Sequence, residues 1–182
     1  MAHRSMASNA EGLAARGIAT LRYNFLYAEK GSKRPDAPRL AHAAVRAAAK
    51  RAVEAADGLP IFAGGRSFGG RMTSQAQAAE PLAGVHGLAF LGFPLHPAGK
   101  PGIERAAHLA EVGVPMLFVS GSRDALADLE LLKPVVDGLG DRAALHIVEH
   151  ADHSFKVAAR NGRTSADAEN EALDALAAWM LK

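Results

Sequence analysis

The chain has 182 residues, contains no cysteine and carries a formal net charge of +2. This length suits one domain with its own buried core, and the absence of cysteine excludes disulfides and thiolate metal sites. The longest apolar stretch, residues 85–95, is interrupted by Gly92 and Pro94 and is too short to cross a bilayer. Because the first residues show no secretory pattern, we expect a soluble, cytoplasmic protein without a membrane partner.

Segments of helical and strand-like spacing alternate along the chain. Helices are expected over residues 6–16, 68–80, 103–111, 128–139 and 165–180, and a further one runs from a cap at Asp36 to its close at Asp57 and Gly58. Strands are expected over residues 18–25, 59–63, 84–93, 114–120 and 144–149. This alternation predicts an α/β fold, with a mainly parallel sheet as the middle layer of an α/β/α arrangement. Ligands of such sheets bind beyond the carboxyl ends of the strands.

Several helix boundaries carry signals of their own. Asp36 is expected to cap the helix that has Pro38 in its first turn. Thr164, with Asp167 three residues later, forms a capping-box pattern before the last helix. Pro134 conflicts with a continuous helix over residues 128–139, so that helix either begins near residue 133 or kinks.

A glycine-flanked serine directly follows the strand at residues 59–63 and precedes a helix. A serine at such a sharp turn takes a cramped backbone conformation, so Gly65 and Gly69 are the residues that the turn requires. Ser67 is then held clear of the sheet. The N–H of Phe68, at the start of the helix, points to the place where an oxyanion forms. The pattern predicts a nucleophile, although glycines also serve as plain strand-to-helix connections.

An acid and a base follow later strands. Asp124 comes after the strand at residues 114–120, with Asp128 as the fallback, and His153 comes after the strand at residues 144–149. Histidine removes a proton from a serine hydroxyl near neutral pH and later protonates the leaving group. The carboxylate fixes the tautomer of the ring and stabilises the imidazolium. Ser67, Asp124 and His153 therefore predict a catalytic triad.

Simpler interpretations exist for each of these residues. Asp124 also suits a turn cap, and His153 also suits a solvated loop. Together, His150, Asp152 and His153 could indicate a metal site, but no further ligand motif completes it. We expect no cofactor and no metal.

The segment at residues 30–39 gathers lysines and arginines in an otherwise mixed charge pattern. Such a segment either holds a phosphate or another anion or forms a solvated loop. Aromatic residues do not alternate with the basic ones, so nucleic-acid binding is not expected.

With Ser67, Asp124 and His153 in this order, the chain resembles the α/β-hydrolase superfamily. More narrowly, it is similar to compact, lidless hydrolases near the dienelactone-hydrolase branch, over most of its length. The matching segments are residues 21–25, 65–71, 92–97, 121–124 and 152–155. Dienelactone hydrolases proper have cysteine where this chain has Ser67, so their substrate is not carried over.

The resemblance also implies a departure. In such hydrolases a central strand, ending in a His-Gly oxyanion loop, precedes the first helix, which here begins almost at Met1. Family topology places the absent strand between the strands at Ile18 and Ile61, so a gap is expected in the middle of the sheet. We therefore expect residues 1–182 to form one N-terminally truncated domain. A longer gene product, closure by the neighbouring strands, or a strand from another chain would each account for the gap.

These observations predict a serine hydrolase that cleaves a small-molecule ester or similar acyl bond through an acyl-enzyme intermediate. Tyr27, Phe93, Leu95 and His96 are candidates for the wall of the substrate pocket. The alternative is a non-catalytic hydrolase-like scaffold or binding module, which the absent oxyanion loop favours. A homo-oligomer is compatible with the sequence.

Overall fold

A parallel four-stranded sheet forms the middle of the molecule. The computed structural model describes residues 4–182, with side chains from residue 6 onward. The strands are β1 (Ile61–Arg66), β2 (Val85–Leu91), β3 (Met116–Gly121) and β4 (Ala143–Val148). They lie in the order β1-β2-β3-β4, and each neighbouring pair is parallel. Four of the five expected strands are confirmed, with small shifts at their ends.

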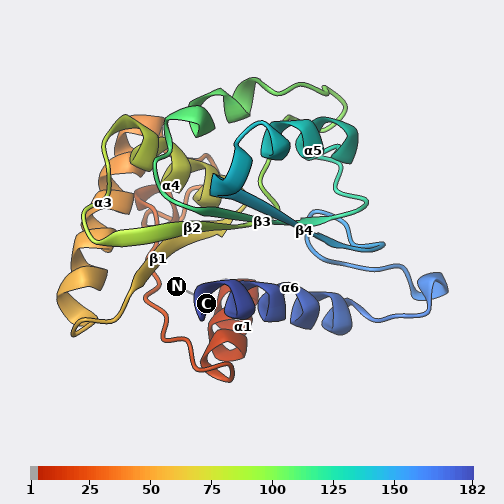
Figure 1. Cartoon of the computed structure of the whole chain (residues 1–182), viewed down its shortest axis with the longest axis horizontal. Helices are drawn as coiled ribbons and strands as arrows, with labels where there is room; N and C mark the ends of the chain where they lie inside the picture. The colour runs from red at the N-terminus through yellow and green to blue at the C-terminus, as the bar shows by residue number, and fades with distance from the viewer. Residues whose placement is uncertain (1–3) are drawn as a thin grey trace.

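Helices cover both faces of this sheet (Figure 1). The α-helices are α1 (Arg4–Ala14), α2 (Leu26–Glu29), α3 (Pro38–Ala55), α4 (Phe68–Ala79), α5 (Leu129–Asp137) and α6 (Ser165–Met180). Short 3₁₀ helices are η1 (Glu104–Glu111), η2 (Gly140–Arg142) and η3 (Ala159–Asn161). Helices α1 and α6 lie on one face, and α3, α4 and α5 lie on the other. The expected three-layer α/β/α fold is thus confirmed.

Two apolar clusters hold the layers together, and the alternation of side chains along the strands separates them. In β2, Leu88 and Phe90 face the cluster under α3, α4 and α5, whereas Ala89 and Leu91 face the cluster over α6. Both faces of β2 and β3 are buried, as expected for strands covered by helices on two sides.

The segment at residues 18–25, expected to be a strand, forms none. Backbone becomes a strand only where a neighbouring strand supplies hydrogen bonds, and the sheet ends at β1, whose six residues are all only partly buried. The segment packs through side chains instead, with the Phe25 ring 5.3 Å from the Phe68 ring. The sheet is also continuous from β1 to β4, so the gap expected in its middle is absent and the open position lies at its edge.

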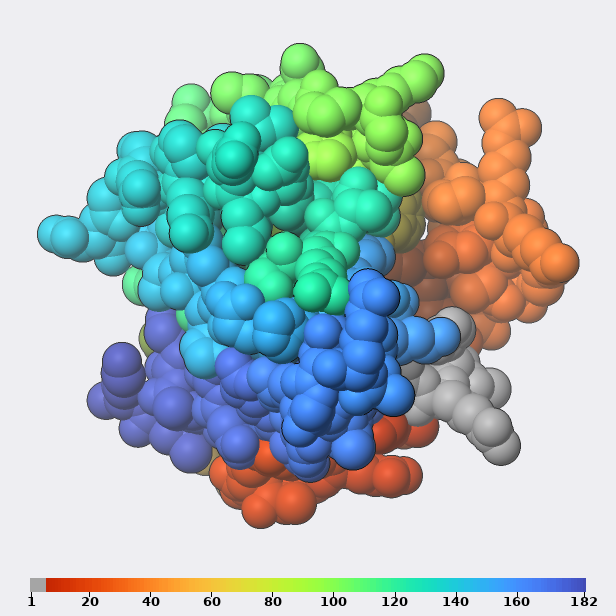
Figure 2. Space-filling model, turned by 90° about the vertical axis from the view of Figure 1, so that its right-hand side faces the viewer, coloured from red at the N-terminus to blue at the C-terminus, as the bar shows by residue number. Residues whose placement is uncertain are grey.

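The loops that follow the strands gather on one face of the molecule. Figure 2 shows this face hollowed between the orange residues that precede α3, the green residues that follow β2 and the blue residues that follow β4. Within the described residues, no helix is long and apolar enough to cross a membrane.

Some helix boundaries differ from those expected. Asp36 does not cap α3; its carboxylate accepts the Tyr27 N–H at 3.1 Å, and Ala37 stands at the cap position. Asp128 caps α5 by accepting the Glu130 N–H at 3.0 Å, so that helix begins at Leu129 and includes Pro134. The segment at residues 103–111 is a 3₁₀ helix rather than an α-helix.

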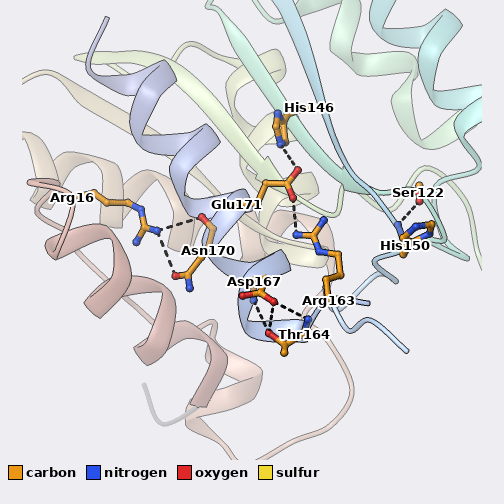
Figure 3. Close-up of polar contacts among 9 residues, drawn as sticks. All are labelled: Arg16, Ser122, His146, His150, Arg163, Thr164, Asp167, Asn170 and Glu171. Atoms are coloured by element: carbon orange, nitrogen blue, oxygen red, sulfur yellow. Dashed lines mark hydrogen bonds and ion pairs between the residues drawn. The ribbon is translucent and has the colours of Figure 1, made fainter. Parts of the chain in front are cut away.

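The capping box of α6 is confirmed. The Thr164 hydroxyl accepts the Asp167 N–H at 3.1 Å, and the Asp167 carboxylate accepts the Thr164 N–H at 2.8 Å (Figure 3). The Thr164 N–H and the Thr164 hydroxyl, the latter at 2.8 Å, both donate to the Asp167 carboxylate and hold its pKa below the usual value, because they favour the ionised form. The sequence predicts this capping box because its hydrogen bonds involve only residues 164 to 167.

Charged side chains tie α6 to its neighbours (Figure 3). Glu171 accepts a hydrogen bond from Arg163 at 2.7 Å and lies 3.1 Å from His146 Nε2 of β4. The Arg16 guanidinium, just after α1, contacts the Asn170 side chain at 3.4 Å. Helix α6 is thereby fixed to both the sheet and α1.

Candidate active site

Strand β1 leads into the turn that carries Ser67. The serine has φ +50° and ψ −119°, a conformation that side chains rarely adopt. Its N–H donates to the Leu91 carbonyl at 3.1 Å, which holds the turn against the end of β2. The next residue, Phe68, begins α4. The structure thus has the sharp, strained turn between a strand and a helix that the sequence predicts, and we call residues 65–70 the elbow.

The glycines that this turn requires differ in part from those expected. A Cβ on Gly65 would lie 3.3 Å from the Gly70 nitrogen, and a Cβ on Gly70 would lie 2.7 Å from the Gly65 oxygen. A Cβ on Gly69 would meet only the Phe25 ring, at 3.9 Å, which is ordinary contact. The close approach of strand and helix therefore restricts positions 65 and 70, and the expectation for position 69 was wrong.

The structure brings the three residues expected to form a triad into one hydrogen-bonded line. His153 Nε2 lies 2.8 Å from Ser67 Oγ, and His153 Nδ1 lies 2.9 and 2.8 Å from the two carboxylate oxygens of Asp124. An ionised carboxylate only accepts hydrogen bonds. Nδ1 therefore carries the proton, and Nε2 is free to accept the proton of the serine hydroxyl.

The loop after β3 holds the carboxylate in place. Asp124 is 5% exposed, and its Oδ1 also accepts the Leu126 N–H at 2.8 Å. Asp128, the fallback candidate, instead serves as the cap of α5. The structure thus places Asp124, and not Asp128, against His153.

A glycine that the sequence analysis did not single out makes room for the histidine. Gly92, at the end of β2, has φ +65°, and a Cβ there would lie 3.2 Å from His153 Nδ1. The backbone of Gly92 therefore forms a wall against which the imidazole packs. A positive-φ glycine after a strand was the available signal, but only the folded structure shows which side chain it faces.

Arg66 and Phe155 form a second contact between the elbow and the histidine loop. The Arg66 guanidinium lies 5.2 Å from the centre of the Phe155 ring, within range of a cation–π interaction. Phe155 is 2% exposed and has φ +59°. Burial lowers the pKa of Arg66, whereas the nearby charges of Glu169 and Asp152 oppose that shift.

The start of α4 offers backbone donors beside the serine. Arg71 is the first residue of this helix whose N–H bonds back to the turn, to Ser67 O at 3.1 Å. The N–H groups of the residues before it lack partners within the helix, as at every helix start. The Phe68 N–H is one of these, next to Ser67, where the positive end of the helix dipole also lies.

The four residues expected to line the pocket lie in different environments. Phe93 and Leu95 are 1% and 0% exposed and belong to the core; the Phe93 ring contacts Phe118, because the chain turns inward after β2. They offer no surface to a substrate, which corrects that expectation. Tyr27 is partly exposed, and its ring lies 6.1 Å from the Phe68 ring. Only Tyr27 of these four lies beside the elbow.

His96, the fourth, is buried and joins two loops. Its Nε2 accepts the Asp128 N–H at 3.1 Å, and its Nδ1 lies 3.0 Å from the Pro97 carbonyl, to which it donates. It also lines a cavity of about 300 Å³ shared with Ser122 and Asp124. His96 thus helps to hold the loop that carries Asp124.

The backbone of His150, a residue considered above for a metal site, contacts the loop after β3. Its N–H donates to the Ser122 hydroxyl at 2.7 Å (Figure 3), and His153 is directed at Ser67 and Asp124. Among residues 6–182, no group of three or more histidine, aspartate or glutamate side chains is arranged to hold a metal ion.

Known proteins share this architecture. The structure of an alpha-beta serine hydrolase homologue from Coxiella burnetii superposes with a TM-score of 0.73 at 20% identity, covering 96% of this chain and 77% of that one. An a/b serine hydrolase without lid from Xanthomonas campestris gives 0.72 at 20% identity, with 98% and 75% covered. An esterase domain from Rhodothermus marinus gives 0.65 at 18% identity, with 96% and 78% covered.

At these identities the solved structures show a common fold. A family model described as alpha/beta hydrolase domain matches residues 1–181, almost the whole chain. The chain therefore belongs to the alpha/beta hydrolase family.

Proposed function

We propose that this protein is a serine hydrolase that cleaves carboxylic esters or similar acyl bonds. The observation that carries the proposal is the line from Ser67 Oγ through the His153 ring to the buried Asp124 carboxylate, with every contact between 2.8 and 2.9 Å. No other residue is required to move a proton along this line.

The chemistry follows from the tautomer of the ring. His153 Nε2 removes the hydroxyl proton while Ser67 Oγ bonds to the acyl carbon, and Asp124 stabilises the resulting imidazolium. The imidazolium then protonates the leaving alcohol as its bond to carbon breaks, which leaves an acyl-serine. A water molecule attacks this ester with His153 again as base, and the acid product and free Ser67 are released.

Charge on the carbonyl oxygen is stabilised by the start of α4. The Phe68 N–H and the helix dipole both face the place where the oxyanion forms. Removal of one such donor typically lowers turnover by about 10²- to 10³-fold. Since Phe68 is the one donor that we assign, we expect slow turnover and a preference for activated esters of small acyl groups.

Covalent labelling tests the proposal directly. An aryl fluorophosphonate reacts with an activated serine, so the intact protein should gain one adduct, which peptide mapping assigns to Ser67. The Ser67→Ala variant should gain none, while Ser74→Ala, which removes a buried serine of α4, should be labelled normally.

A well-folded wild-type protein that stays unlabelled, and that hydrolyses no ester, would contradict the proposal. It would support the non-catalytic scaffold instead. Circular dichroism and thermal melting of each variant provide the folding control.

A further inference from the structure

Two polar contacts align three helices beside the elbow. His42 Nε2 of α3 lies 3.3 Å from Gln75 Oε1 of α4. One residue earlier in α4, Ser74 Oγ lies 2.7 Å from His108 Nε2 of η1. Helix α4 therefore contacts α3 and η1 at the same level along its axis.

The three helices also run in the same direction. Further along α3, Arg46 donates to the Ala76 carbonyl at 2.7 Å and the Glu80 carbonyl at 3.0 Å, so α3 and α4 advance together. Helix α4 begins at the end of β1, and η1 ends shortly before β3 begins. Both therefore run from the carboxyl edge of the sheet, where Ser67 lies, towards the opposite edge.

One turn closer to Ser67, each helix carries an arginine. Arg39 precedes His42 by three residues, Arg71 precedes Ser74 by three, and Arg105 precedes His108 by three. Residues three apart share a face in α-helices and are eclipsed in 3₁₀ helices. The contacts above thus place the three arginines in one layer, the arginine layer, defined as Arg39, Arg71 and Arg105.

The guanidinium groups of this layer have no ion-pair partner among the described residues, although Glu104 precedes Arg105 in the first turn of η1. Among the described residues, none of the three arginines forms a side-chain ion pair or hydrogen bond, and Arg71 Nε is buried without a partner. Burial, followed by the charge of Arg105, lowers the pKa of Arg71. Neither α3 nor α4 has an acidic residue in its first turn, so their dipoles add to the positive potential.

Guanidinium groups bind carboxylates and phosphates with paired hydrogen bonds. We propose that the arginine layer binds an anionic group, a carboxylate or a phosphate, at the far end of the acyl chain of the substrate. This proposal rests on the proposed function and names the class of substrate. Arg71 follows Ser67 by four residues, a rise of about 6 Å along the helix, which suits a short acyl chain.

Paired esters test the substrate class. The mono-4-nitrophenyl ester of glutarate is compared with 4-nitrophenyl valerate, which has the same chain length and no charge, with spontaneous hydrolysis subtracted. We expect kcat/KM to favour the anionic ester by at least about tenfold at low salt. The preference should fall in about 0.5 M sodium chloride, because salt screens charges at a partly exposed site.

Variants assign this preference to the layer. Arg71→Gln and Arg105→Gln should each bring the ratio of the two kcat/KM values close to one, and Arg71→Lys should keep part of it. Arg51→Gln is the matched control, since Arg51 is an exposed arginine on the far half of α3, and it should leave the ratio unchanged.

The outcomes separate this proposal from the hydrolase proposal. If both esters are hydrolysed equally by Ser67, the anion proposal is overturned and the hydrolase proposal stands. If neither ester is hydrolysed, calorimetry with glutarate decides: binding that Arg71→Gln abolishes supports the layer, and no binding overturns it. Binding of inorganic phosphate alone, without ester preference or glutarate binding, indicates a free-anion site and overturns the assignment to substrate.

Discussion

Among the described residues, two serine hydroxyls contact the ring of a histidine, and the two contacts have nearly the same length. Ser67 Oγ lies 2.8 Å from His153 Nε2, and Ser74 Oγ lies 2.7 Å from His108 Nε2. Both serines belong to the same turn-and-helix unit, seven residues apart. What differs is the second hydrogen bond that each partner makes, and this decides which pair can perform chemistry.

In the first pair, the proton is directed away from the serine. The Asp124 carboxylate accepts a hydrogen bond from His153 Nδ1, so Nε2 has a lone pair available for the serine proton. In the second pair, the Ser74 hydroxyl donates to the Arg71 carbonyl at 2.9 Å. Its oxygen therefore accepts from Nε2–H of His108, which is the reverse of the arrangement that activates a serine.

Exposure and charge separate the pairs further. Ser74 is 0% exposed, so no substrate can reach it. Burial lowers the pKa of His108 to about 4, and the charges of Arg71 and His42 add to the shift. Within residues 6–182, no carboxylate forms an ion pair with His108, whereas Asp124 contacts His153. A short distance between serine and histidine is thus insufficient, because the group behind the histidine determines its function.

The largest effect should come from removing the Ser67 hydroxyl, with removal of the Ser74 hydroxyl as the comparison. Ser67→Ala should lower turnover of 4-nitrophenyl acetate by about 10⁴-fold or more, because the nucleophile is lost. Ser74→Ala should change turnover by less than about threefold. Ser74 is buried away from Ser67 and His153, so its loss acts mainly on the stability of the fold. Equal losses in both variants would contradict the distinction between the two pairs.

The carboxylate behind the histidine is the next test. In Asp124→Asn the side-chain amide can donate to Nδ1, which moves the ring proton to Nε2 and should lower kcat by about 10³- to 10⁴-fold. Asp128→Asn is the matched control, because asparagine is also a good helix cap. Steady-state kinetics on the same ester would refute the role of Asp124 if the two variants behaved alike.

Sequence reasoning predicted the fold and the convergence of Ser67, Asp124 and His153 because both depend on the order of elements along the chain. Alternating segments predicted the sheet and its covering helices, and Ser67, Asp124 and His153 follow the ends of three strands. Parallel strands bring such positions to one edge whatever the details of packing. The expectation therefore needed only the correct order of elements.

Other features depend on partners that are distant in sequence. Residues 18–25 have strand composition but lack a neighbouring strand. Phe93 and Leu95 follow a strand just as His153 does, yet the segment after β2 turns inward and buries both side chains in the core. The need for glycine at position 70 rather than 69 depends on the approach of Gly65. Each of these is decided by tertiary contacts that override local pattern.

The backbone of Gly92, which packs against His153, offers an intermediate effect. In Gly92→Ala the new methyl group would meet His153, so the ring must shift, and a misplacement of that size should lower kcat by about 10- to 100-fold. Gly99→Ala is the matched control, because Gly99 has nearly the same φ, +70° against +65°, and nothing within 4 Å of the added Cβ. Both variants pay the same backbone strain, so a loss confined to Gly92→Ala isolates the contact. Comparable kcat values would show that the wall does not position the ring.

The smallest effect concerns stability rather than turnover and comes from the second pair. Since the pKa of His108 is about 4 in the folded protein and 6.5 is its ordinary value, the unfolded chain binds more protons between these pH values. The contribution of neutral His108 to stability is therefore present above pH 6.5 and is lost as the pH falls towards 4. Because the side chain is only partly buried, solvent screening limits the loss to about 1–2 kcal/mol.

His108→Gln provides the comparison, because its amide can still donate to Ser74 Oγ but does not titrate. The free energy of unfolding, measured with urea at several pH values, should fall more steeply for the wild type than for His108→Gln between pH 6.5 and 4. The difference between the two proteins removes the contribution of the carboxylates, which titrate in both. Parallel curves would show that folding does not lower the pKa of His108, and the second pair would then lose the feature that most clearly separates it from Ser67 and His153.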